Sequence, residues 1–415
     1  MADSAENSIK RDVKVIALVS AAHGMSHFYQ LVPGPLFLLI KESMGVSYTE
    51  LSFIVMAFFS ASGLAQAPAG FLVDRYGGRR VLIGGLVLEA IGLGLMGLSP
   101  RFWLLLPLAL LAGLGNSVFH PAGYSILSHL VNSRRVARAY SAHTFFGNIG
   151  WAMAPAVTLG LAGLFGWRGA LLCIGLAGIG IALLFAAGSR HLIDDLHHRQ
   201  SMQASGHTLT NAAYLAVLLS PRILFCFGYF VLLAITLTCM QNFMPSALHL
   251  IYGIAPQIAA WALTVYLIGG ALGILAGGVA ADRFPHHEWI VCAGFLTAAT
   301  LLLTVAVTSL PIGMLMTTIA LAGFASGTTT PSRDMLVRHA TPPGSIGKVF
   351  GFVYSGVDLG NVFAPPMMGY FLDHGLPRMV FVTAAASLIC AIAAAFGTRW
   401  NVAGRQAAPR PTPAE

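Results

Sequence analysis

Residues 70–80 read Gly70-Phe-Leu-Val-Asp74-Arg75-Tyr-Gly77-Gly78-Arg79-Arg80, and a shorter copy, Gly278-Val-Ala-Ala-Asp282-Arg283, follows 208 residues later. Each stretch closes a long apolar segment with an Asp-Arg pair. Glycines favour a tight turn at such a point, and arginines favour the aqueous side of a membrane. Two such turns, half a chain apart, indicate an internal repeat.

The chain is too apolar and too poor in charge for a soluble domain. Hydrophobic residues make up 56% of its 415 residues and charged residues 9%, whereas a soluble domain carries about 25% charged residues. Runs such as 81–98, in which Glu89 is the single charge, can cross a hydrocarbon core as helix. Because backbone polar groups in lipid must be satisfied internally, we expect an all-α membrane protein.

The apolar runs predict twelve transmembrane helices in two pseudo-symmetric six-helix bundles. The expected spans are 14–40, 48–73, 79–99, 102–130, 138–165, 167–188, 221–250, 255–281, 287–309, 311–337, 348–373 and 377–398. Residues 1–188 and 221–398 form the two bundles. We interpret the polar residues 189–220 as a cytoplasmic linker and the proline-containing residues 399–415 as a disordered cytoplasmic tail.

Further identities support a duplication. Three pairs of identical residues are separated by 210 positions: Gly113 and Gly323, Gly150 and Gly360, Pro155 and Pro365. A constant offset over several helices indicates that one six-helix unit was repeated in parallel, which is typical of one transporter architecture.

The basic residues indicate how the chain is oriented. The 23 Lys and Arg residues give a net charge of +8. Nineteen of them fall on one predicted side of the membrane. The four on the opposite side are Lys41, Arg101, Arg168 and Arg378. The positive-inside rule therefore predicts cytoplasmic termini in a multi-pass protein of the bacterial inner (plasma) membrane. It also explains the charge without a nucleic-acid partner.

Residues 70–80 resemble the signature between the second and third helices of the major facilitator superfamily, and residues 278–283 lie between helices eight and nine, as in that family. The resemblance covers nearly the whole chain. It implies the major facilitator fold and secondary active transport by alternating access, not an enzyme. Within the superfamily, Gly115-Asn-Ser-Val-Phe119-His120-Pro121 looks like the fourth helix of fosmidomycin-resistance-type exporters.

The charged turn predicts a conformational latch between the two halves. The predicted latch residues are Gly70, Asp74, Arg75, Gly77, Arg79, Arg80, Asp282 and Arg283. The arginines can pair with the carboxylate of Asp74 at a helix end, and such a cluster can form in one state and break in the other. The alternative is that the arginines only fix the orientation in the membrane.

The resemblance implies that the first, fourth, seventh and tenth helices line a cavity, so their polar residues are candidates for the substrate site. The predicted substrate-binding residues are His23, His27, Gln30, Asn116, His120, Met240, Met244 and Arg333. His23, His27 and Gln30 share one helix face. Polar side chains within a membrane are costly and usually face a cavity or a partner. An interhelical hydrogen bond is the alternative for each, and an ion pair with Asp334 is the alternative for Arg333.

Two acids in mid-span, Asp358 and Glu89, are the candidates for proton coupling. An unpaired carboxylate in hydrocarbon takes up a proton rather than staying charged. Asp358 is favoured because the repeat places an amide, Asn148, at the equivalent position. The alternative for Glu89 is a hydrogen bond to a neighbouring backbone. Histidines such as His143 titrate near neutral pH and can share a proton relay.

We therefore expect proton-coupled export (antiport) of a small organic solute. The transporter would be a monomer in the lipid bilayer, driven by the proton gradient, without a cofactor or bound metal. Gly147, Gly150 and Pro155 partly match the antiporter signature of exporters, although Ala154 stands where that signature has glycine.

Three other functions are alternatives to export. Proton-driven uptake of an organic anion or metabolite fits Arg333 and the histidines. Copper import would use the thioethers of Met240 and Met244, one turn apart, but the eighth helix lacks the His-x-x-x-Met of copper importers. A membrane enzyme is disfavoured, because no nucleotide loop, HExxH or GxSxG is present.

Overall fold

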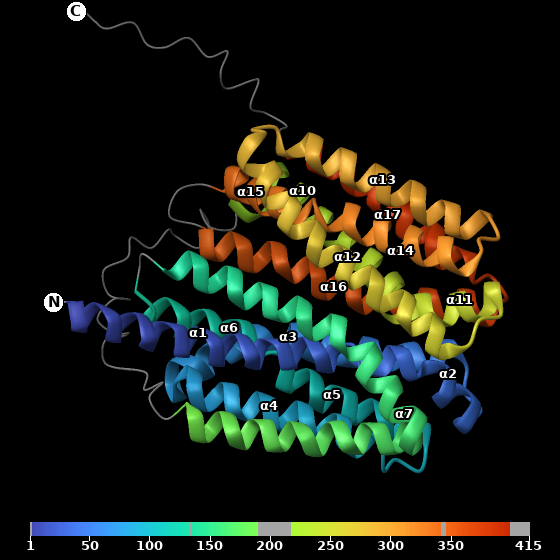
Figure 1. The fold of residues 1–415 in the computed structure, drawn as a ribbon, viewed down its shortest axis with the longest axis horizontal. Helices are drawn as coiled ribbons and strands as arrows, with labels where there is room; N and C mark the ends of the chain where they lie inside the picture. Colours follow the sequence, from blue (N-terminus) through green and yellow to red (C-terminus); the bar gives the residue numbers. More distant parts are fainter. Residues whose placement is uncertain (1, 133–134, 190–216, 342–345, 399–415) are drawn as a thin grey trace, which may run out of the picture.

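A computed structural model describes residues 2–132, 135–189, 217–341 and 346–398. These described residues fold into helices and contain no strand. The helices run roughly along the long axis of the molecule in two groups, α1 to α7 in blue to green and α10 to α17 in yellow to red (Figure 1). The prediction of an all-α fold is confirmed.

The first group contains two helices broken near their middle and one kinked helix. Its elements are α1 (Ala2–Gln30), α2 (Pro33–Met44), α3 (Tyr48–Tyr76), α4 (Gly78–Met96), the short η1 (Phe102–Leu104), α5 (Leu105–Asn116), α6 (Phe119–Leu130) and α7 (Val136–Gly188). The kink in α7 lies at Gly166, whose φ of +69° is open to glycine at no steric cost. This kink lies where the fifth and sixth expected spans meet.

The second group repeats this arrangement. Its elements are α10 (Pro221–Thr238), the π-helical turn η2 (Cys239–Phe243), α11 (Met244–Tyr252), α12 (Pro256–Arg283), α13 (His287–Val307), α14 (Ile312–Gly327), α15 (Thr330–Ala340), α16 (Ile346–Asp373) and α17 (Arg378–Gly397).

The described helices supply about twelve membrane crossings. Nine segments are long and apolar enough to span a membrane, and one of them, Arg138–Gly188, holds the two crossings joined at Gly166. The remaining crossings are α4, which carries two arginines and Glu89, and α16, which carries Asp358 and Asn361. Charge and polarity keep these two helices out of the apolar set, although each is long enough to cross.

Equivalent glycines make equivalent contacts in the two groups. A Cβ atom on Gly113 of α5 would clash with the carbonyl oxygen of Phe58 in α3. A Cβ atom on Gly323 of α14 would clash in the same way with the carbonyl oxygen of Tyr266 in α12. Both members of each contact are therefore repeated, so the duplication seen in the sequence is also a duplication of helix packing.

Four crossings are interrupted, although the sequence predicted each as one continuous helix. The interruptions lie at residues 31–32, 117–118, 239–243 and 328–329, in the first, fourth, seventh and tenth crossings. At the first, Pro33 cannot donate a backbone hydrogen bond, so the helical hydrogen-bond pattern stops there although Val32 keeps helical φ and ψ. Interruptions at corresponding positions of two repeats are typical of the binding region of a transporter.

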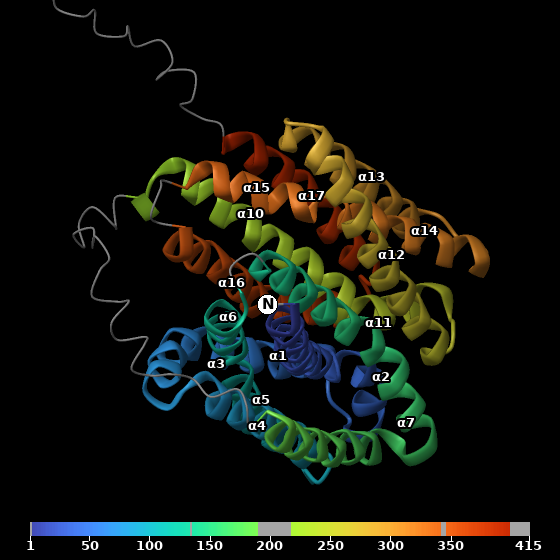
Figure 2. The ribbon, with the colours of Figure 1, turned by 60° about the vertical axis from the view of Figure 1, so that its left-hand side comes forward.

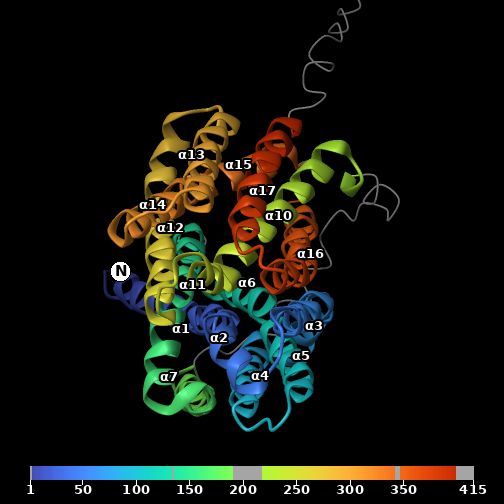
Figure 3. The ribbon, with the colours of Figure 1, turned by 90° about the vertical axis from the view of Figure 1, so that its right-hand side faces the viewer.

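The two groups meet along α3 with α16 and along α7 with α12. Figures 2 and 3 both show α16 bordering α3 across the boundary between the groups. At one end of this boundary, Asp373 of α16 accepts a hydrogen bond from the backbone N–H of Tyr48 in α3, at 2.8 Å. The limits of the predicted bundles stay predictions, because most of the linker, residues 190–216, and the tail lie outside the described residues.

Candidate functional site

Four histidines from three helices lie together in the first group. His23 and His27 come from α1, His120 from α6 and His143 from α7. The ring centroid of His23 lies 3.8 Å from that of His143, 4.2 Å from that of His27 and 5.1 Å from that of His120. His120 is partly exposed and the other three are buried. These residues are called the histidine cluster below.

Glycines on neighbouring helices leave the room that the rings occupy. A Cβ atom on Gly147 of α7 would lie 2.7 Å from Nδ1 of His27 and 2.8 Å from Cε1 of His23. A Cβ atom on Gly123 of α6 would lie 2.9 Å from Cε1 of His143. The cluster therefore depends on two positions that carry no side chain.

A hydrogen-bonded network lies beside the cluster and is centred on Asn116 of α5. Its amide nitrogen donates to Oε1 of Glu89 at 2.9 Å and to Oγ of Ser26 at 2.7 Å. Its carbonyl oxygen accepts from Oγ of Ser62 at 2.9 Å and from Nε2 of Gln30 at 3.4 Å. Asn116 thus bonds to side chains from three other helices.

The network continues to the histidine cluster through an aromatic ring. The indole nitrogen of Trp151 donates to Oε1 of Gln30 at 3.1 Å. The same indole stacks on His27, with ring centroids 4.1 Å apart and an interplanar angle of 15°. The predicted substrate-binding residues Gln30 and Asn116 are thus joined to Glu89. Glu89 is fully buried, and its Oε2 has no hydrogen-bond partner among the described residues.

Asp358 occupies a different place, at the contact between the two groups. A Cβ atom on Gly63 of α3 would lie 2.8 Å from the Cβ atom of Asp358 in α16. The side chain is half-buried, and no hydrogen bond or ion pair joins it to another described residue. The two predicted proton carriers are therefore separate, because Glu89 lies inside the first group.

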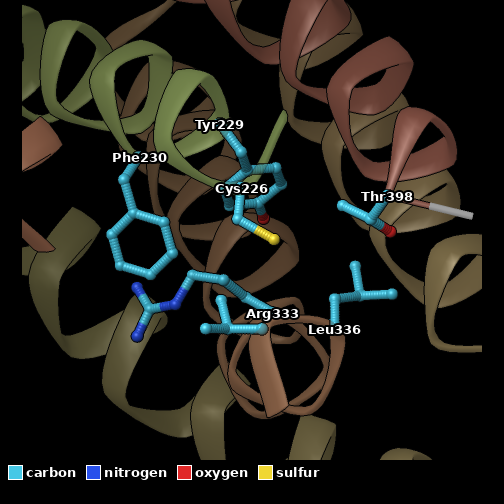
Figure 4. A pocket seen from close by; sticks show the side chains of 7 residues that line it. Cys226, Tyr229, Phe230, Arg333, Leu336 and Thr398 are labelled. Atoms are coloured by element: carbon cyan, nitrogen blue, oxygen red, sulfur yellow. The ribbon is translucent and has the colours of Figure 1, made fainter. Parts of the chain in front are cut away.

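Arg333 of α15 is paired with its neighbour in sequence. Its Nε lies 2.9 Å from Oδ1 of Asp334, and its guanidinium lies over the ring of Phe230, 4.9 Å from the centroid. Figure 4 shows the guanidinium beside Phe230 in a small pocket that Cys226 and Tyr229 also line. This ion pair with Asp334 is the alternative to substrate binding that the sequence indicated for Arg333.

Met240 and Met244 are fully buried in the hydrophobic core around the π-helical turn η2. The neighbouring sulfur of Cys239 lies 3.3 Å from that of Met368 in α16. Apolar packing explains these methionines in this conformation, and their role as substrate ligands stays a prediction.

The predicted latch residues make their described contacts within their own group. Arg79 donates to Oγ of Ser189 at 3.0 Å and to the carbonyl of Ala186 at 2.7 Å, which ties α4 to the end of α7. Gly77 has φ of +83° and permits the turn between α3 and α4. The side chain of Asp74 lies outside the described part of the structure. The exposed latch residues are Arg75, Arg80, Asp282 and Arg283, and Gly70 is half-buried.

The conformational latch stays a prediction. The structure also contains an ion pair, between Asp12 and Arg135, that the sequence did not indicate. Asp12 of α1 is fully buried, and its Oδ2 lies 2.7 Å from Nη2 of Arg135 and 3.1 Å from the backbone nitrogen of Asn132. In the sequence, Asp12 lies in a short charged segment that looks solvated. No local pattern distinguishes it.

The whole chain resembles proteins of known family. The sequence model of the Major Facilitator Superfamily matches residues 16–250 and 227–415. The chain belongs to this superfamily. It is a multi-pass membrane transporter and not an enzyme, because the family and its relatives are transporters.

The relatives of this major facilitator include the fosmidomycin resistance protein of Escherichia coli K12, which is 25% identical and covers 88% of each chain. The uncharacterized MFS-type transporter YfnC of Bacillus subtilis strain 168 is 25% identical over 69% of each chain. A solved bacterial homolog of the human lysosomal transporter Spinster, inward-facing and occupied, aligns with a TM-score of 0.76 and 16% identity over 96% of this chain and 99% of that chain. This last likeness concerns the fold alone.

Proposed function

We propose that this major facilitator exports a small organic solute in exchange for protons. It would act as a monomer in the inner membrane of a bacterium, with both termini cytoplasmic. The observation that carries the proposal is the position of Asp358, a carboxyl group without a described partner at the contact between α3 and α16.

Alternating access requires the two groups of helices to move against each other. A carboxyl group on the moving boundary is covered in one state and wetted in the other. Water stabilises the ionised form of the group, and apolar contact stabilises the protonated form. Each cycle can therefore take up a proton on one side of the membrane and release it on the other.

Glu89 is the second candidate for a proton carrier. It lies within a packed network and keeps a hydrogen bond to Asn116 at 2.9 Å. A group so enclosed changes its surroundings less than one on the boundary. Asp358 is therefore favoured over Glu89.

Export is supported by the relative named for resistance to fosmidomycin, which aligns over 88% of both chains. Proton-driven uptake of an organic anion is the second candidate, because Arg333 offers a guanidinium within the membrane. Asp334 already pairs with that guanidinium at 2.9 Å, so an anionic ligand has to compete with a carboxylate. This competition makes uptake of an anion the less supported function.

The test uses the purified protein in proteoliposomes that enclose a pH-sensitive dye. A panel of organic solutes, with the phosphonate fosmidomycin as the first member, is added across an imposed pH gradient. We expect at least one solute to move protons opposite to its own direction. Solute flux that is unaffected by collapse of the pH gradient would contradict the proposal. Solute and proton moving in the same direction would favour uptake.

A further inference from the structure

We propose that His23, His27 and His120 form a binding site for a transition-metal cation of the Zn²⁺ class. One ring nitrogen from each of the three lies within 4.8 Å of the other two. The three rings come from α1 and α6, so two helices would supply all three ligands. The site is separate from Asp358 and does not depend on the identity of the transported solute.

The hydrogen bond of His23 fixes which of its nitrogens can bind a cation. Nδ1 lies 2.9 Å from the backbone carbonyl oxygen of His143. A carbonyl oxygen only accepts, so Nδ1 carries the proton and Nε2 keeps its lone pair. Nε2 is buried and has no hydrogen-bond partner among the described residues. A ligating histidine is usually held in this way, with its other nitrogen bonded to a carbonyl group.

His27 presents a second unpartnered nitrogen. Its Nδ1 is also buried without a hydrogen-bond partner in the described structure. Buried polar atoms are nearly always satisfied, so an unpartnered ring nitrogen within this cluster is a candidate metal ligand. A bound cation would satisfy both at once.

Gly147 keeps the room that the rings of His23 and His27 need. A Cβ atom there would lie 2.7 Å from Nδ1 of His27 and 2.8 Å from Cε1 of His23. Any side chain at this position would therefore press on the two rings. His143 stacks flat against His23, with an interplanar angle of 12°, and supports the ring of His23 from its face.

The donor set and its geometry select the class of cation. Imidazole nitrogens suit Zn²⁺, Co²⁺, Ni²⁺ and copper, whereas Mg²⁺ and Ca²⁺ require oxygen ligands. Nitrogens bound at about 2.0–2.1 Å lie roughly 3.3 Å apart around a tetrahedral ion. The ring nitrogens lie within 4.8 Å of one another, so metal binding requires the rings to rotate and approach each other. His120 is partly exposed, which provides an entry path. Three protein ligands leave the fourth position of a tetrahedral ion to water or a solute atom.

The experiment measures metal bound to the purified full-length protein after removal of any affinity tag. The protein is dialysed against Zn²⁺, then against metal-free buffer, and analysed by elemental mass spectrometry. We expect one Zn²⁺ per chain. His23→Gln, His27→Gln and His120→Gln should each weaken binding by roughly tenfold or more, as loss of a ligand must cost at least as much as loss of a supporting contact.

Two further variants sharpen this test. Gly147→Ala removes no ligand but presses on the rings of His23 and His27, and it should also weaken binding. His129→Gln is the matched control, because this exposed histidine of α6 bonds to the carbonyl oxygen of Ser125 at 2.7 Å. It should bind Zn²⁺ like the unaltered protein. Binding of Zn²⁺ by the three ligand variants that equals binding by the unaltered protein would overturn the proposal.

X-ray absorption of the Zn²⁺-loaded, unaltered protein decides the question even if a variant fails to fold. The expected spectrum has three imidazole nitrogens at about 2.0–2.1 Å. A shell of six oxygens, or a protein that retains no Zn²⁺, would overturn the proposal.

Discussion

Asp373, the last residue of α16, accepts two hydrogen bonds from Thr49 at the start of α3: one from the backbone nitrogen at 2.8 Å and one from the hydroxyl group at 2.6 Å. The carboxylate thereby covers the N-terminus of a helix in the other group, where negative charge is favoured. These bonds join the two halves at one end of their boundary. They have to break if the halves separate there during alternating access.

Asp373→Ala should shift the transporter toward the state in which this end is open. A charge-assisted hydrogen bond contributes about 1.5–3 kcal/mol, so loss of even one changes the ratio of the two states by roughly tenfold. The measurement is the distance distribution between spin labels on the first turn of α3 and the last turn of α16. His374→Gln is the control, since His374 follows the end of α16 and bonds to the carbonyl of Tyr370 within the same group of helices. An unchanged distribution in Asp373→Ala would show that the contact does not hold this end closed.

Gly63→Ala should destabilise the protein and Gly70→Ala should not, although both glycines lie in α3. A Cβ atom on Gly63 would lie 2.8 Å from the Cβ atom of Asp358, and overpacking of this kind costs about 1–3 kcal/mol. No atom lies within 4 Å of a Cβ atom on Gly70. Thermal unfolding of the two purified variants tests the difference. Transport lost in a fully stable Gly70→Ala variant would support the predicted latch, and equal unfolding temperatures would contradict the close approach of α3 and α16.

Glu89→Gln should be tolerated, whereas Asn116→Leu should not. The amide of a glutamine can still accept the hydrogen bond that Asn116 gives to Glu89. A leucine at 116 leaves the buried side chains of Glu89, Ser62 and Ser26 without their shared partner, and each buried unsatisfied group costs about 1–3 kcal/mol. Thermal unfolding should therefore separate the two variants clearly. The reverse order of stability would mean that the network is not what holds these helices together.

The sequence predicted most of the fold, because apolar runs and the repeat can be read directly along the chain without knowledge of tertiary contacts. The expected spans match the described helices closely, and Gly166 lies where one span was expected to pass into the next. The breaks at residues 31–32 and 117–118 were not predicted. They depend on local backbone geometry near Pro33 and Pro121, which a count of apolar residues does not reveal.

The site was predicted less completely than the fold. The sequence identified His23, His27 and Gln30 as one face, since their spacing is helical. It could not predict that Asn116 joins Gln30 to Glu89, because these residues belong to three different helices. Only tertiary packing brings them together, and the roles assigned to them in substrate binding stay predictions.

The most direct test of proton coupling is the Asp358→Asn variant in proteoliposomes. Two quantities are measured: solute movement driven by a pH gradient, and exchange of labelled for unlabelled solute without a gradient. Asn at this position cannot carry a proton but keeps nearly the same shape. Ser355→Ala, an exposed position in the same helix, serves as the control. We expect Asp358→Asn to lose gradient-driven movement and to retain exchange. Gradient-driven movement equal to that of Ser355→Ala would contradict proton coupling through Asp358.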